Sequence, residues 1–74
     1  MPKEFFNETI KYNAQYYHIA GFQDIDNASV LIYRFIGDDI DQEPICEIEL
    51  TDEERLDVEN SIRNIINNLG EYLN

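Results

Sequence analysis

The sequence predicts an α+β domain, a three-stranded antiparallel sheet (meander) with one long C-terminal helix packed on one face. Three observations support this prediction. Residues 14–22 and 29–36 are rich in aromatic and β-branched side chains, residues 45–50 alternate between apolar and charged, and apolar residues recur at helical spacing from 58 to 73. Short connections between these segments favour a meander with the middle strand in the centre. At 74 residues the chain forms a single domain, residues 1–74.

Residues 2–12 fit two structures. Phe6 and Ile10 are four residues apart and Pro2 suits a first helical turn, so we expect a short N-terminal helix. Phe6, Ile10 and Tyr12 also share one side of a period-two pattern, which leaves a strand open. A single helix covers only one face of three strands. The other face therefore needs the N-terminal segment, a second copy in a homodimer, or a partner.

The strand patterns assign side chains to faces. In the first strand, the even-numbered residues from Tyr16 to Phe22 are expected on one face, and Gly21 suggests a bulge or a close backbone approach. The second strand, SVLIYRFI, is apolar on both faces, which is typical of a central strand. In the third, Glu47 and Glu49 are expected to face solvent, where charge also protects a sheet edge.

The helix has a recognisable start. Thr51-Asp52-Glu53-Glu54 is a capping box, and its two middle acids are expected beside the positive end of the helix dipole. Gly70 is expected to end the helix. Leu56 falls outside the apolar stripe, so it is either exposed to solvent or a contact for a partner.

Charge is the strongest functional signal. Sixteen acidic residues against five basic ones give a formal net charge of −11. This charge disfavours direct binding to nucleic acid or to an anionic membrane, and it favours a basic protein partner, such as a protein that itself binds nucleic acid. Eleven of the acids lie between Asp38 and Glu59. The structural alternative is that the acidity serves only to keep the protein soluble.

Catalytic and metal-binding patterns have little support. His18 is the only histidine and Cys46 the only cysteine, which together do not make a zinc site. Residues 39–43, DIDQE, resemble the start of an EF-hand loop, but Pro44 stands where that loop needs glycine. A weak, nonspecific cation site stays open. Paired carboxylates can hydrolyse glycosides, but a domain of this size has little room for a sugar cleft. We therefore expect no enzymatic activity, no cofactor and no specific metal.

A cytoplasmic location is expected. One cysteine excludes an intramolecular disulfide, the N-terminus lacks an apolar run of signal-peptide length, and no window approaches the length of a membrane span.

The expected function is the mimicry of a row of phosphates. Carboxylates spread over a loop, a sheet edge and a helix start can occupy a basic channel that otherwise binds nucleic acid. A tyrosine can contribute at such an interface. The expected partner-binding residues are Asp38, Asp39, Asp41, Glu43, Glu47, Glu49, Asp52, Glu53 and Tyr33. The loop acids in this set, residues 38–43, have no evident structural task.

The order strand–strand–strand–helix with an acidic third loop is expected in the stretch QYYHIAGFQDIDNASVLIYRFIGDDIDQEPICEIELTDEERLDVENSIRNI. This order is similar to that of the small acidic anti-CRISPR proteins, which occupy nucleic-acid clefts of CRISPR nucleases. The resemblance lies in size, charge and element order, and no individual residue is carried over. It implies an inhibitor from a phage or mobile element that mimics DNA. The alternative is an antitoxin, an immunity protein or a subunit that binds through an apolar sheet face.

Overall fold

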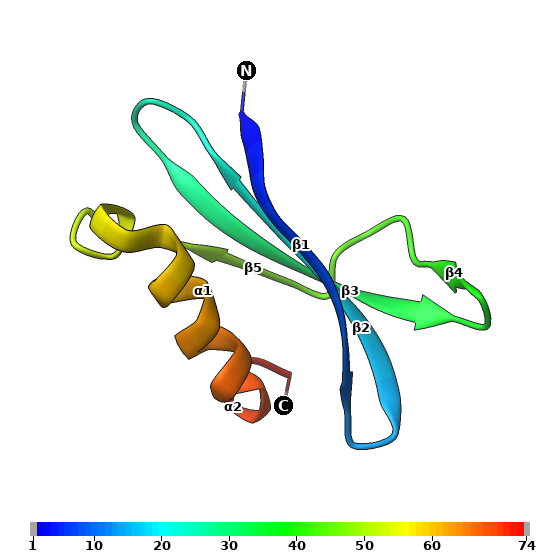
Figure 1. The fold of residues 1–74 in the computed structure, drawn as a ribbon. Coiled ribbons are helices and arrows are strands. Elements are labelled where there is room, and N and C mark those ends of the chain that lie inside the picture. The colour runs from blue at the N-terminus through cyan, green and yellow to red at the C-terminus, as the bar shows by residue number, and fades with distance from the viewer. Residues whose placement is uncertain (1, 74) are drawn as a thin grey trace.

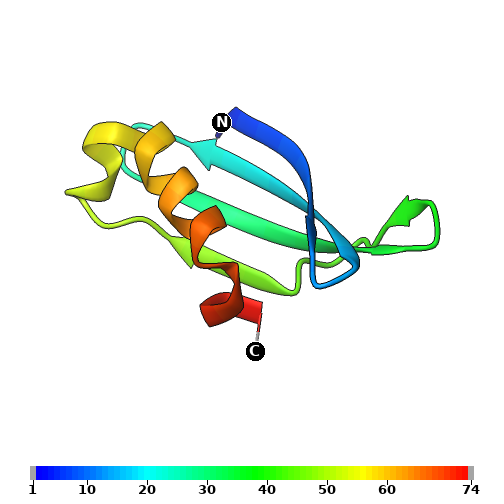
Figure 2. The same ribbon diagram turned by 60° about the horizontal axis from the view of Figure 1, so that its bottom comes forward.

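The computed structural model describes residues 2–73 and has an α+β fold in which C-terminal helices cover one face of a curled antiparallel sheet (Figures 1 and 2). The class agrees with the sequence prediction, but the sheet has more strands and the helix is interrupted. The elements are β1 (Lys3–Tyr12), β2 (Gln15–Gln23), β3 (Ala28–Ile36), β4 (Asp39–Ile40), β5 (Cys46–Glu49), the 3-10 turn η1 (Glu54–Asp57), α1 (Val58–Asn67) and α2 (Leu69–Leu73).

The expectation of a short N-terminal helix is wrong, because this segment forms the edge strand β1. It pairs with β2 over its whole length, from Lys3 opposite Gln23 to Tyr12 opposite Gln15. The hairpin turns through Asn13 and Ala14, whose φ angles are 49° and 65°. Two positive φ values in succession are the signature of the type I′ turn that suits a two-residue hairpin. Pairing with β2 thus prevails over the weak helical spacing.

A bulge in β1 brings an aromatic ring onto the neighbouring strand. The register shifts between Glu4 and Phe6, so Phe5 is the extra residue. A Cβ atom at Gly21 would lie 2.6 Å from the nearest Phe5 ring carbon. Of the two alternatives expected at Gly21, the bulge lies in the neighbouring strand β1, and the group that closely approaches the Gly21 backbone is the Phe5 ring.

The central position of the second predicted strand is confirmed, since β3 pairs with β2 on one edge and with β4 and β5 on the other. The count of three strands was too low. β4 and β5 form one interrupted strand, because Asp41 N donates to Arg34 O (2.9 Å) and Ile45 N donates to Ile32 O (2.8 Å). Between these bonds residues 42–44 loop out of the sheet. Pro44 has no N–H for a ladder and so suits this interruption.

The predicted long helix is divided. The carbonyl of Glu54 in η1 accepts a hydrogen bond from Ser61 Oγ (2.8 Å), which ties η1 to α1. Between α1 and α2 the break falls at Asn68, whose side-chain amide donates to Asn64 O (2.8 Å). The prediction that Gly70 ends the helix is wrong. Gly70 lies within α2, where the Tyr12 hydroxyl packs against its backbone. This contact connects the end of β1 to the C-terminal helix.

The core lies between the sheet and α1. Its largest fully buried side chains are Ile19 from β2, Val30 and Ile32 from β3, and Ile62 from α1. Burying one such side chain contributes about 1.5–3 kcal/mol. Because the helices cover only one face of the sheet, the opposite face is left without a covering element of the described chain (Figure 2).

Candidate partner-binding surface

The predicted loop acids lie on and beside the β3–β4 hairpin. Asp38 occupies its two-residue turn with Gly37, whose φ of 65° lets the chain reverse. Asp39 begins β4 and Asp41 follows it. Asp41 Oδ1 accepts only a long hydrogen bond from Glu43 N (3.4 Å), in the loop that precedes β5. Among the described residues, this long contact is the hydrogen bond that the side chains of these four acids make.

Glu47 and Glu49 lie on β5, and both side chains are exposed as predicted. They stand opposite Leu31 and Ser29 of β3, on the sheet face that the helices do not cover. We call this face the open face. Cys46 and Ile48 alternate with them and face the core, so the predicted orientation of this strand is confirmed.

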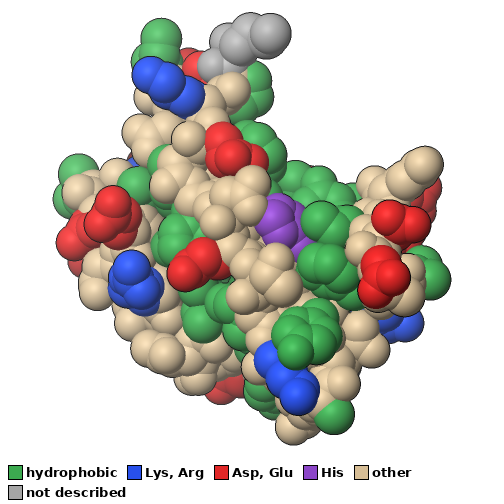
Figure 3. Space-filling view, turned by 45° about the vertical axis from the view of Figure 1, so that its right-hand side comes forward, with side chains coloured by type: hydrophobic (Ala, Val, Ile, Leu, Met, Phe, Trp, Pro, Cys, Tyr) green, Lys and Arg blue, Asp and Glu red, His purple; other side chains and the backbone are tan. Residues whose placement is uncertain are grey.

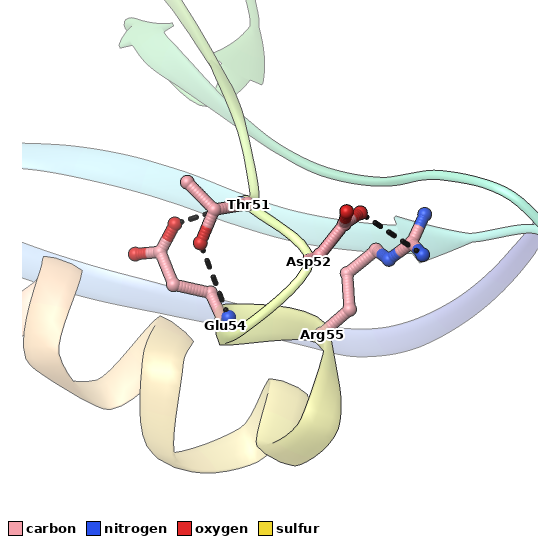
Figure 4. A network of polar contacts seen from close by, with 4 residues as sticks. All are labelled: Thr51, Asp52, Glu54 and Arg55. Atoms are coloured by element: carbon pink, nitrogen blue, oxygen red, sulfur yellow. Dashed lines mark hydrogen bonds and ion pairs between the residues drawn. The ribbon is translucent and has the colours of Figure 1, made fainter.

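Asp52 and Glu53 lie in the predicted capping box, which is formed (Figure 4). Thr51 N donates to Glu54 Oε1 (2.8 Å), and Glu54 N donates to Thr51 Oγ1 (3.2 Å). The box starts η1 and not the α-helix, so the expected contact of Asp52 and Glu53 with the helix dipole is wrong. Asp57 takes that place as the N-cap of α1, with its carboxylate accepting from Asn60 N (3.1 Å).

Together these eight carboxylates, all exposed except the partly buried Asp41, follow one edge of the molecule. We call this set the acidic edge: Asp38, Asp39, Asp41, Glu43, Glu47, Glu49, Asp52 and Glu53. It starts at the β3–β4 hairpin, passes along β5 and ends at η1, and the hairpin and η1 lie at opposite ends of the molecule (Figures 1 and 2). The molecule extends 35 Å along its longest axis. The acids therefore form a line and not a single compact patch.

Little positive charge balances the acidic edge. Within residues 2–73 one ion pair forms, in which a guanidinium nitrogen of Arg55 lies 3.3 Å from Asp52 Oδ1 (Figure 4). Asp52 is almost fully exposed, so this pair contributes little to stability. The remaining carboxylates of the edge are available to cations in solution or on a partner.

The open face carries aromatic side chains. Tyr33 lies here beside His18 of β2, with ring centroids 6.3 Å apart, and Tyr16 meets Phe35 edge to face at 6.4 Å. Figure 3 shows the only histidine, in purple, among hydrophobic side chains in green, with carboxylates in red beyond them. Tyr16 is 51% exposed. Among residues 2–73 no helix or strand covers this aromatic surface.

His18 and Cys46, the two residues considered as zinc ligands, lie on opposite faces of the sheet. His18 pairs with Tyr33 on the open face, whereas Cys46 pairs with Ile32 and faces the core. Among residues 2–73 no group of three His, Cys, Asp or Glu side chains is placed to hold a metal ion. The Nδ1 atom of His18 is buried and has no hydrogen-bond partner.

Two exposed apolar residues, Leu56 and Ile25, lie close together, and the sequence predicted only the first. Leu56, expected to be exposed or a partner contact, is 86% exposed, and Ile25 in the β2–β3 loop is 93% exposed. Both line a cavity of about 190 Å³, together with Val58. The sequence does not single out Ile25, because its polar neighbours indicate only a turn. An isoleucine within a polar turn was the signal available.

No family model, curated protein or solved structure matches this chain. Within the described residues, no helix is both long enough and apolar enough to span a membrane.

Proposed function

We propose that this protein is an acidic inhibitor that binds the basic, nucleic-acid-binding surface of another protein and blocks it by mimicking DNA. The observation that carries the proposal is the acidic edge, a line of carboxylates along one side of the sheet with a single ion pair in the described chain. Solubility alone requires charge, but it does not require eight of the sixteen acids to follow one edge.

The dimensions of the acidic edge suit this role. One strand of DNA carries a phosphate about every 3.4 Å of helix axis. The 35 Å length of the molecule therefore corresponds to about ten phosphates of one strand. The eight carboxylates of the acidic edge supply a similar number of charges over that length. A channel that binds a strand through spaced lysines and arginines can engage such an array.

The acidic edge is also held by ordered backbone. β5 is hydrogen-bonded to β3, and the Thr51–Glu54 capping box fixes the chain where Asp52 and Glu53 project. An array that is already ordered loses little conformational entropy when it binds. The sequence suggests a likeness to small acidic anti-CRISPR proteins, and because size and charge still support it, a CRISPR nuclease or another defence effector is the target class we favour.

A second function is supported by the open face. An antitoxin, an immunity protein or a subunit would bind through Tyr33, Phe35 and their neighbours, because exposed aromatic residues are frequent anchors at protein interfaces. In that case Tyr33→Ala and Phe35→Ala weaken partner binding strongly, and salt has little effect.

Two variants of equal charge distinguish these functions. The first neutralises the loop acids, as D38N/D39N/D41N/E43Q. The control neutralises four exposed acids elsewhere, as E8Q/D26N/E59Q/E71Q. Each removes four negative charges, which changes the formal net charge from −11 to −7.

The assay is affinity capture from extracts of the source cell or its host, at low and at high salt. We expect the wild type and the control to retain a nucleic-acid-binding protein at low salt, and high salt or added duplex DNA to release it. The loop variant should lose most of this capture. Equal capture by the loop variant, or a partner that resists high salt, would contradict the proposal and favour the open face.

A further inference from the structure

A cavity opens at one end of the open face, beside the β2–β3 loop. Its volume is about 300 Å³, and its walls include Phe22, Ser29, Leu31, Asp24 and Glu47. Phe22 stands opposite Ser29, and Leu31 stands opposite Glu47, so all four side chains share the open face. The volume is at the small end of the range for ligand sites and suits one long side chain.

The cavity combines an apolar wall with two carboxylates from separate elements. Phe22 and Leu31 are partly buried and supply the apolar wall. Asp24 comes from the β2–β3 loop and Glu47 from β5. Asp24 Oδ1 accepts a hydrogen bond from Ile25 N (2.8 Å), which fixes this carboxylate at the loop. Among the described residues, none of those that line the cavity is a lysine or an arginine.

We propose that this cavity receives an arginine side chain of the basic partner. The proposal rests on the proposed function, since it assumes that the partner is basic. Arginine can lay its aliphatic stem along an apolar surface while its guanidinium stays in polar surroundings. The Leu31 wall of the cavity suits the stem, and the two carboxylates suit the guanidinium. The planar guanidinium stacks on an aromatic ring such as Phe22 and donates several hydrogen bonds to carboxylates. Lysine offers a point charge and no planar group, so it fits this site less well.

The same face already holds a cation of the chain itself. Lys11 Nζ lies 5.6 Å from the centroid of the Tyr16 ring, on the open face of the β1–β2 hairpin.

A second copy of this protein is a poor occupant, because two chains of net charge −11 repel each other. Phosphate groups of nucleic acid are disfavoured at the cavity by the same charge.

The probe is a blocked tripeptide with arginine between two glycines, titrated into isotopically labelled protein and followed by amide chemical shifts. Its control is the same peptide with citrulline, which keeps the shape of arginine but has no charge. We expect saturable shifts centred on Phe22, Leu31 and Glu47 with the arginine peptide only. Glu47→Gln should weaken binding about fivefold, as expected for one partly exposed ion pair. Glu71→Gln on α2 should leave the affinity unchanged.

Equal shifts with citrulline, shifts that follow the acidic edge without centring on the cavity, or an unchanged affinity in Glu47→Gln would each overturn the arginine site. The spectrum of Glu47→Gln also reports whether that variant is folded. D38N/D39N/D41N/E43Q leaves the cavity intact and should bind the peptide like the wild type. Salt-sensitive capture of a partner without peptide binding would refute the arginine site alone, whereas peptide binding without such capture would refute the proposed function alone.

Discussion

Replacement of Gly21 by alanine tests how β1 is held on the sheet. The new Cβ atom would meet three carbons of the Phe5 ring at 2.6, 2.8 and 3.0 Å. Favourable carbon contacts lie at about 3.5–4.0 Å, so the ring has to move by roughly 1 Å. Overpacking of this kind costs about 1–3 kcal/mol. Removing a strand glycine returns about 0.5–1 kcal/mol, and we expect a net loss of about 1–2 kcal/mol.

The assay is urea unfolding followed by circular dichroism, with thermal unfolding as a second measure. A loss of about 1–2 kcal/mol lowers the melting temperature of a domain this size by about 5–15 °C. In a Phe5→Ala background the ring is absent, so Gly21→Ala should be neutral or stabilising by up to about 1 kcal/mol. Equal destabilisation in both backgrounds would show that the Phe5 ring does not rest on Gly21.

Three further predictions concern other local features. Thr51→Ala should reduce the free energy of unfolding by about 1 kcal/mol, because it removes the acceptor for Glu54 N. In a Glu54→Ala background the loss should be smaller, and additive losses would refute a reciprocal capping box. Ala14→Gly should stabilise the protein by about 0.5 kcal/mol in urea unfolding, because Ala14 has a φ of 65°, and destabilisation would contradict the type I′ turn. Added sodium chloride should raise the urea midpoint by screening the net charge of −11, and a midpoint that falls or stays constant would show that self-repulsion is unimportant.

Local signals in the sequence were sufficient for much of the fold. The alternation in residues 45–50 correctly placed Glu47 and Glu49 outside the core, because period two leaves only one orientation once the core face is known. The capping box was also predictable, since Thr51 and Glu54 need only each other. Such features depend on residues that are close in the chain.

The wrong predictions concern features that depend on contacts between residues far apart in the sequence. Phe6 and Ile10 suit both a helix and a strand, and only pairing with β2 selects the strand. The turn at Asn13 and Ala14 lacks the glycine that usually marks this hairpin type. Gly70 looked like a helix end, but its role is to admit the Tyr12 hydroxyl from the other end of the chain.

The candidate surface was predicted in part. The acidic edge contains the acids expected from the sequence, because their positions on a loop, an exposed strand face and a capping box follow from local pattern. Their arrangement as a line spanning the molecule depends on β4 and β5 sharing one edge of β3, which the sequence did not predict. The cavity joins Phe22, Asp24 and Glu47 from separate elements and was likewise beyond local reasoning.

Competition with DNA for the captured partner tests the central claim most directly. The partner is bound to a fluorescent duplex, and fluorescence anisotropy reports displacement by the wild type, by D38N/D39N/D41N/E43Q and by the equally charged E8Q/D26N/E59Q/E71Q. We predict that the wild type and the second variant displace the duplex at low salt and that the first variant displaces little. A partner that keeps its DNA while binding this protein, or equal displacement by both variants, would contradict the account.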